Sequence, residues 1–237
     1  MNKQAILEGA KKWFRESVAI NHIANTEKLT NPKSFNINPF TTVYLANFLT
    51  GNSSPESIAK ALLFPRVLGT SIATTFGNSV QQFTHDVLGA FASTTHGIDI
   101  EFMDHIDGYK KYCQLKSGPN TINKDDVETI AGHFNGVIHL ARTNGLRVPH
   151  SDMIVGVIYG EEHQLNGHYK RINSQYHFPV YTGKSFWHRL TGDECFYHDL
   201  IVAIGSVAVE ADYSHEFQDI IRQLAATEIV QNMSNHN

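Results

Sequence analysis

A small group of polar residues near the middle of the chain could hold a divalent cation and activate water. Its members are the carboxylates of Asp99 and Glu101, the amide of Gln114 and the ammonium of Lys116. Carboxylate, amide and backbone carbonyl oxygens are suitable ligands for Mg²⁺, so Asp99, Gln114 and the carbonyl of Leu115 are candidate metal ligands. The ammonium of Lys116 could hold or deprotonate a water molecule and balance charge that develops on a phosphate. This set of groups is typical of a metal-dependent phosphodiesterase.

A β-hairpin is expected to bring these side chains together. Polar and apolar residues alternate over 97–102 and again over 112–117, which is typical of strands with one buried face. Between them, Asp107-Gly108 suits a two-residue type I′ turn, because both residue types tolerate positive φ. This turn would place side chains opposite one another on one face of the hairpin, in the pairs Asp99–Lys116 and Glu101–Gln114.

The same pattern has a purely structural interpretation. Asp99 and Lys116 could form an ordinary cross-strand ion pair on a solvated face, worth about 0.2–1 kcal/mol. A catalytic site would also benefit from another carboxylate, since the amide of Gln114 is neutral. Glu101 is the nearest on the predicted hairpin, and Glu56 or Asp86 could contribute from helices.

The composition is that of a globular protein with a sizeable core. The chain has 237 residues, of which 41% are hydrophobic and 18% charged, and it contains no apolar run long enough to cross a bilayer. Its two cysteines lack the spacing of a disulfide framework or a thiolate zinc site, which makes the cytoplasm the expected location. The net charge of −4 argues mildly against nucleic acid. A locally positive cleft or a bound cation can reverse that argument.

Hydrophobic periodicity predicts helices on both sides of a mixed sheet. Asn123 with Asp126 resembles a capping box, and Ser54 is a good N-cap. Residues 68–71 are expected to form a tight loop. Besides the hairpin, the predicted strands are 153–159 and 177–181. The predicted helices are 3–24, 39–50, 54–63, 72–91, 123–143, 193–211 and 216–231.

The hairpin resembles the catalytic signature of the PD-(D/E)xK nuclease superfamily, in a D…QxK form. More specifically, residues 97–102 and 112–123 are similar to type II restriction endonucleases that cut GGNCC-type interrupted palindromes. Three further blocks resemble the same enzymes in the same order, and the resemblance covers about residues 39–212. These blocks are 65–71, 154–160 and 180–187.

The resemblance implies an α/β (α+β) fold with a restriction-endonuclease-like core, in which helices flank a mixed central sheet. A single domain is expected over residues 1–237. It would consist of an N-terminal helical extension (1–38), a catalytic core (39–212) and a C-terminal helix (213–237). The resemblance also implies a homodimer that binds double-stranded DNA and cuts both strands with Mg²⁺, leaving 5′-phosphate ends. No membrane partner is expected.

Asp99 matches the metal-binding aspartate of that family and Lys116 its active-site lysine. Gln114 stands where an acid is usual, which leaves the number of metal ions open, and Glu101 lies outside the minimal motif. Arginine and lysine read guanine best, although each could equally contact phosphate or solvent. The candidate base readers are Arg66, Arg142, Arg147, Lys170, Arg171, Lys184 and Arg189. The predicted DNA-contacting residues are Arg66, Thr70, Ser71, Ser117, Asn120, Asn123, Lys124, Lys170, Arg171 and Lys184.

Two other functions fit the same features. A DNA repair or junction-resolving nuclease could use the same fold and site. Alternatively, the chain could be a non-catalytic DNA-binding protein in which the hairpin charges are structural.

Overall fold

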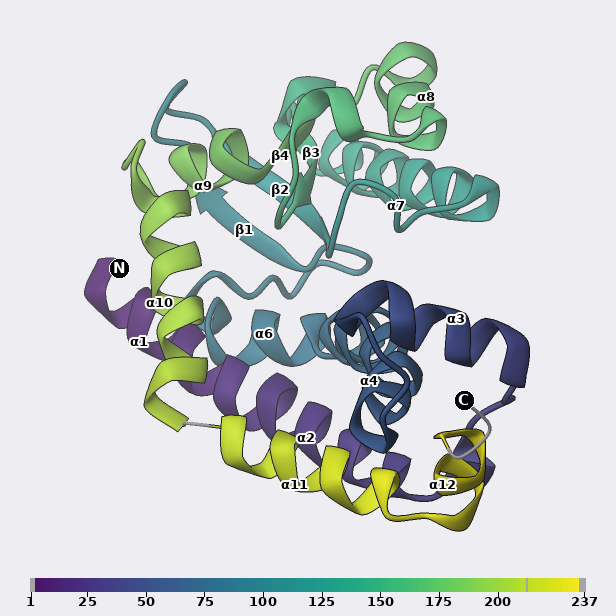
Figure 1. Cartoon of the computed structure of the whole chain (residues 1–237). Helices are drawn as coiled ribbons and strands as arrows, with labels where there is room; N and C mark the ends of the chain where they lie inside the picture. Colours follow the sequence, from purple (N-terminus) through teal and green to yellow (C-terminus); the bar gives the residue numbers. More distant parts are fainter. Residues whose placement is uncertain (1–2, 212, 235–237) are drawn as a thin grey trace. The chain divides into compact units, whose positions relative to one another are not determined.

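The computed structural model describes residues 3–211 and 213–234, which fall into two compact units. The first unit contains residues 3–13 and 80–204, and the second contains residues 14–79 and 205–234 apart from residue 212. The expected single domain and its internal boundaries stay a prediction. Residues 235–237 of the expected C-terminal helix lie outside the described residues. Figure 1 shows the elements of both units.

The first unit is built around a mixed sheet (Figure 1). In hydrogen-bonding order its strands are β1 (Ile100–Met103), β2 (Lys110–Lys116), β3 (Met153–Val157) and β4 (Val180–Thr182). The β1–β2 pair is antiparallel, and the β2–β3 and β3–β4 pairs are parallel. The helices of this unit are α1 (Lys3–Trp13), α6 (Val80–Asp86), α7 (Lys124–Thr143), α8 (Gly167–Tyr176) and α9 (Gly183–Thr191). Its 3₁₀-helices are η5 (Gly89–Phe91), η6 (His150–Asp152) and η7 (Glu162–Gln164).

Helices cover both faces of this sheet, which confirms the expected fold class. On one face, Val155 of β3 shares a buried cluster with Phe134 of α7 and Tyr169 of α8. On the other face, Phe186 of α9 packs so closely over Gly156 that an added Cβ would lie 2.5 Å from its ring. Phe186 and its neighbour Trp187 are both fully buried.

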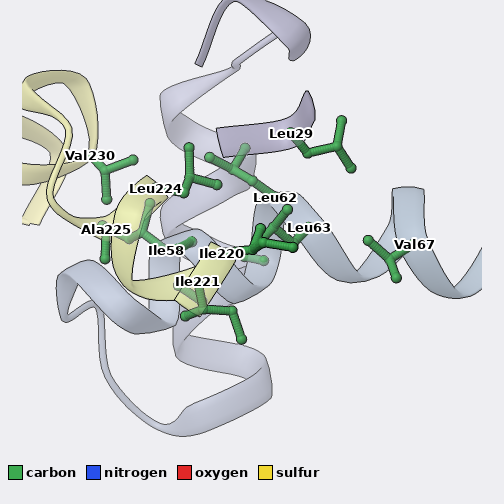
Figure 2. Close-up of a cluster of buried hydrophobic side chains, with 13 residues drawn as sticks. Leu29, Ile58, Leu62, Leu63, Val67, Ile220, Ile221, Leu224, Ala225 and Val230 are labelled. Carbon is green, nitrogen blue, oxygen red and sulfur yellow. The ribbon is translucent and has the colours of Figure 1, made fainter. Parts of the chain in front are cut away.

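The second unit is helical. Its α-helices are α2 (Ile20–Glu27), α3 (Pro39–Thr50), α4 (Pro55–Pro65), α5 (Ile72–Asn78), α11 (Ser214–Ala225) and α12 (Glu228–Ser234). It also contains the π-helices η1 (Phe14–Ala19) and η4 (Arg66–Ser71) and the 3₁₀-helices η2 (Lys28–Thr30) and η3 (Pro32–Ser34). The boundary between the units lies within α10 (Phe196–Ala211). Figure 2 shows the core of the second unit, where Ile58 and Leu63 of α4 meet Leu224 of α11 and Val230 of α12.

Several helix starts follow the predicted local signals. Asn123 caps α7 in a complete capping box with Asp126. Ser54 caps α4, with its side chain accepting a hydrogen bond from the backbone N–H of Ser57. The bounds of α3 match the predicted range.

Other predicted bounds are wrong. The tight loop at 68–71 is part of the π-helix η4, because the helix continues through Pro65 into wider turns that bury Val67. The predicted helix 72–91 is interrupted at Ser79, and the predicted helix 216–231 ends at Ala225 and restarts at Glu228. The predicted helix 3–24 contains the π-helix η1. The helices α8 and α9 were not expected.

Candidate active site

The hairpin forms, but its loop is longer than two residues. Ile100 lies opposite Cys113 and Glu101 lies opposite Tyr112, so the predicted pairs Asp99–Lys116 and Glu101–Gln114 are wrong by two residues. The loop runs from Asp104 to Tyr109, closed by a hydrogen bond of 2.9 Å from the Asp104 N–H to the Tyr109 carbonyl. Because side chains alternate with a period of two, this shift leaves every side chain on its predicted face.

Charges from outside the turn explain the wider loop. Lys111, which is only 1% exposed, places its ammonium 2.8 Å from carboxylate oxygens of both Asp107 and Asp152. The guanidinium of Arg189 lies 2.6 Å from the carboxylate of Asp104. Burying a lysine requires partners of opposite charge. The loop aspartates therefore bind these cations and do not form the ends of a tight turn.

Asp99 lies directly before β1, beside the end of β2. Its N–H donates to the carbonyl of Cys113 (3.0 Å), and its carboxylate accepts a hydrogen bond of 2.7 Å from the N–H of Leu115. In an antiparallel pair the N–H and C=O of one residue point to the same neighbour, so the carbonyl of Leu115 also points to the side of Asp99. Loss of surrounding water raises the pKa of the Asp99 carboxyl, and the Leu115 N–H and the charge of Lys116 oppose this shift in part.

Gln114 presents a buried oxygen that no described residue satisfies. The side chain is 7% exposed, and its Nε2 donates to the carbonyl of Gly97 and to Nδ1 of His133 on α7, the latter at 2.7 Å. The Oε1 atom is buried and has no hydrogen-bond partner within residues 3–211 and 213–234. An unsatisfied buried acceptor costs about 1–3 kcal/mol, so such an atom calls for an explanation such as a bound ion.

Lys116, at the last position of β2, is partly exposed. Its ammonium makes no hydrogen bond or ion pair with another described residue, although its charge offsets part of the rise in the pKa of Asp99. The structural interpretation as an ordinary Asp99–Lys116 ion pair is therefore not observed. The lysine is available to bind an external group.

Glu101, by contrast, has both carboxylate oxygens occupied. Oε1 accepts hydrogen bonds from Ser93 (2.5 Å) and Thr95 (2.8 Å), and Oε2 lies 2.5 Å from the ammonium of Lys110. Burial raises the pKa of Glu101, but the hydrogen bonds from Lys110, Ser93 and Thr95 outweigh it and leave the pKa below its usual value. Glu101 is thus tied to the segment before β1, and the structure does not bring it to Gln114.

The two helix carboxylates do not belong to this cluster within the first unit. The carboxylate of Asp86, at the end of α6, accepts hydrogen bonds of 2.9 Å from Gln82 and is bound by His85 at 2.8 Å. Glu56 lies in the first turn of α4, in the second unit. Neither position adds a carboxylate to the Gln114 cluster within the first unit.

The donor set around Gln114 fits one hard cation. Within the described ranges, no three His, Cys, Asp or Glu side chains gather to hold a metal ion. An ion at the end of β2 would therefore need mixed oxygen ligands: the carboxylate of Asp99, Oε1 of Gln114 and the carbonyl of Leu115. Oxygen ligands of this kind suit Mg²⁺, which also keeps several waters or takes phosphate oxygens of a substrate.

Sequence reasoning missed His133. Its ring reaches Gln114 because residue 97 is glycine: a Cβ there would lie 2.3 Å from Cγ of His133. Gly97 also has a φ of +76°, which favours glycine. The available signal was this glycine at the first position of the predicted strand 97–102.

Some of the predicted DNA-contacting residues follow Lys116 directly. Ser117 and Asn120 lie between β2 and α7, with Ser117 partly buried and Asn120 exposed. Lys124 is exposed at the first position of α7. The side chain of Asn123 accepts hydrogen bonds from the N–H groups of the first turn of α7, so it is already used as a cap.

The remaining candidates are spread over other elements. Lys170 of α8 and Lys184 of α9 are exposed, whereas Arg171 pairs with Glu128 at 2.5 Å. Arg189 is held by Asp104 and by the ring of Tyr181.

Arg66, Thr70 and Ser71 lie in η4 of the second unit. Arg66 donates a hydrogen bond of 3.3 Å to the carbonyl of Ser34, and the hydroxyl of Ser71 is buried without a partner in the part of the chain that the structure describes. A role in DNA binding stays a prediction for all three.

Comparison with known proteins identifies one family. The family model of the type II restriction endonuclease EcoO109I matches residues 38–212, a range that includes the hairpin and α7. No curated protein matches the chain. Among the described helices, none has both the length and the apolar character needed to cross a bilayer.

Proposed function

Because this chain belongs to the type II restriction endonuclease EcoO109I family, it is a site-specific deoxyribonuclease that binds double-stranded DNA, and we propose that it cuts both strands at a short GGNCC-like palindrome with Mg²⁺. The single observation that carries the choice of active site is the cluster at the end of β2. There, three consecutive residues of β2 and the residue before β1 supply a carboxylate, a buried amide oxygen and an ammonium, and the last two have no partner among the described residues.

In this proposal Asp99, Oε1 of Gln114 and the carbonyl of Leu115 hold Mg²⁺. The ion supplies Lewis acidity toward the phosphate and lowers the pKa of water. The neutral amide of Gln114 gives the site less negative charge than a second carboxylate would. A polyanionic substrate therefore meets less repulsion from the protein.

Lys116 acts on the attacking water and on the phosphate. Its ammonium has no partner among the described residues, so it can orient the water and balance the charge that develops on phosphorus. The water oxygen forms a bond to phosphorus while the bond from phosphorus to the 3′ oxygen breaks. The attacking water releases one proton to solvent and the 3′ oxygen takes one up from solvent, so that it leaves as a hydroxyl and the phosphate stays on the 5′ end.

We propose a supporting role for Glu101. Its two oxygens bind Ser93, Thr95 and Lys110, so it fixes the segment that carries Asp99 and does not touch the scissile phosphate. The predicted contacts to DNA fall first on Ser117, Asn120 and Lys124, which follow Lys116 in the chain. The other predicted DNA contacts also remain part of the proposal, and they are made by Arg66, Thr70, Ser71, Asn123, Lys170, Arg171 and Lys184.

A homodimer follows from the proposed substrate, because a palindrome has two equivalent strands and a two-fold dimer matches that symmetry. One helix face suits such a contact. Phe40, Tyr44 and Phe48 of α3 are 88%, 65% and 72% exposed, and the last two rings stack at 6.2 Å. Large exposed apolar surfaces of this kind often mark interaction sites. Light scattering should give the mass of a dimer, and Phe40→Ser with Phe48→Ser should reduce it to that of a monomer. A cytoplasmic location is also part of the proposal.

Digestion of plasmid and phage DNA with Mg²⁺ tests the function. Discrete fragments whose sequenced ends share one palindrome support restriction and identify the recognised bases and the position of the cut. Nicking, or cleavage of branched junctions alone, would support a repair nuclease. Retarded but intact DNA would support a non-catalytic DNA-binding protein.

A further inference from the structure

The amide of Gln114 is held on one side by two acceptors. Its Nε2 carries two hydrogens, and the carbonyl of Gly97 and Nδ1 of His133 take one each. The opposite end of the same amide, Oε1, is the buried oxygen without a partner among the described residues. Both hydrogens are therefore used, and the free atom is the one that a cation can bind.

The identity of the two partners decides which way the amide points. If the amide turned by 180°, Oε1 would face the carbonyl of Gly97, which is always repulsive, and Nδ1 of His133, which is repulsive in the tautomer that carries its proton on Nε2. A carboxylate at position 114 has no preferred orientation to lose, because its two oxygens are equivalent and one of them faces Gly97 and His133 in either case. A glutamine ligand thus needs an orienting neighbour that a glutamate does not need.

Neighbouring residues hold the His133 ring in place against Gln114. Its neighbours on α7, Ala131 and Phe134, are buried in the core of the first unit and fix the helix. Gly97, without a Cβ, leaves space for the ring, and His96 packs edge-on against it with ring centroids 5.3 Å apart.

We propose that His133 is a positioning residue that holds the Gln114 amide with Oε1 directed to the metal site, an inference that rests on the proposed function. His133 does not touch the metal or the DNA in this proposal. Its effect on the reaction passes through the orientation of one amide group.

The test measures binding of Mn²⁺ alone to the full chain by electron paramagnetic resonance, with thermal unfolding as the check that each variant is folded. Removing an outer partner of a metal ligand commonly costs 10–100-fold in affinity, so His133→Ala should weaken Mn²⁺ binding by roughly tenfold. His133→Asn should retain affinity to within about threefold, since the Asn oxygen can accept from Nε2 near the position of Nδ1. His133→Gln is the matched control, because it carries the same amide farther from the backbone. We expect it to bind Mn²⁺ as weakly as His133→Ala does.

A second pair of variants, made in a chain that carries Gln114→Glu, distinguishes orientation of the Gln114 amide from simple packing by His133. In Gln114→Glu the carboxylate has no unique oxygen to present, so adding His133→Ala should change Mn²⁺ affinity by less than about threefold. An equal loss in both backgrounds would show that His133 only supports the packing, and would overturn the inference. So would unchanged affinity in His133→Ala, or the absence of Mn²⁺ binding in a wild-type chain that cuts DNA. A wild type that neither binds Mn²⁺ nor cuts DNA would overturn the proposed function as well.

Discussion

Substitution of Gly97 by alanine should destabilise the first unit through two separate effects. The first is conformational, since Gly97 has a φ of +76°, which disfavours any residue with a Cβ. The second is a collision, because the added Cβ would lie 2.3 Å from Cγ of His133. Gly108 provides a matched control in the same hairpin: its φ is +74°, and an added Cβ meets nothing within 4 Å.

The two effects have distinct magnitudes. A left-handed backbone conformation costs a residue with a Cβ about 1–2 kcal/mol, which is the whole expected loss for Gly108→Ala. Overpacking in a tight environment adds about 1–3 kcal/mol, so Gly97→Ala should lose about 2–5 kcal/mol in all. The displaced His133 ring should also release Gln114 and weaken Mn²⁺ binding, which Gly108→Ala should leave unchanged.

Urea denaturation followed by tryptophan fluorescence measures these losses. The chain has two tryptophans, Trp13 and Trp187, and both are buried in the first unit, so the signal reports the unit that contains the hairpin. Equal losses of unfolding free energy in the two alanine variants would refute the packing of His133 against Gly97. A larger loss in Gly97→Ala with unaltered Mn²⁺ affinity would refute the link from that packing to the metal site.

Three further outcomes are expected. Lys116→Ala should lower the cleavage rate by at least about 10²-fold while gel-shift binding to DNA in Ca²⁺ persists, and full cleavage would remove Lys116 from the mechanism. Asp99→Asn should abolish cleavage yet stabilise the protein at pH 7. The fold raises the pKa of Asp99 above its ordinary value of 3.8, so ionisation costs the folded state stability as the pH rises through that shifted pKa. Urea denaturation should show a higher unfolding free energy for Asp99→Asn than for the wild type at pH 7 but not at pH 3. A higher value at both pH values would contradict the reasoning. Lys111→Met should cost about 3–5 kcal/mol of unfolding free energy, because it leaves two carboxylates without their buried cation. The same measurement on Lys3→Ala, which breaks two partly exposed ion pairs with Asp193 and Asp199, is the control and should show a smaller loss of unfolding free energy.

Local sequence signals predicted much of the first unit. The capping box at Asn123, the buried strand Met153–Val157 and the polar face of the hairpin all depend on residues close together in the chain. For the same reason Asp99, Gln114 and Lys116 could be grouped on one face from the alternation of polar and apolar residues alone.

Features that depend on distant residues could not be predicted in this way. The hairpin register is set by charges on Asp152 and Arg189, which follow the loop by tens of residues. The contact of His133 with Gln114 requires α7 to lie over Gly97, and no local pattern indicates that placement. Continuation of the helix through Pro65 likewise reflects packing of the second unit, which outweighs a local helix-ending signal.

The buried ammonium of Lys111 links the length of the hairpin loop to the identity of one strand residue. A loop cut down to two residues would remove the position from which Asp107 reaches that ammonium, and the buried lysine would keep Asp152 but lose one of its two carboxylate partners. Loop shortening and an apolar residue at position 111 should therefore occur together in evolution. A relative with a tight turn but a retained lysine should depend more strongly on the acid at position 152.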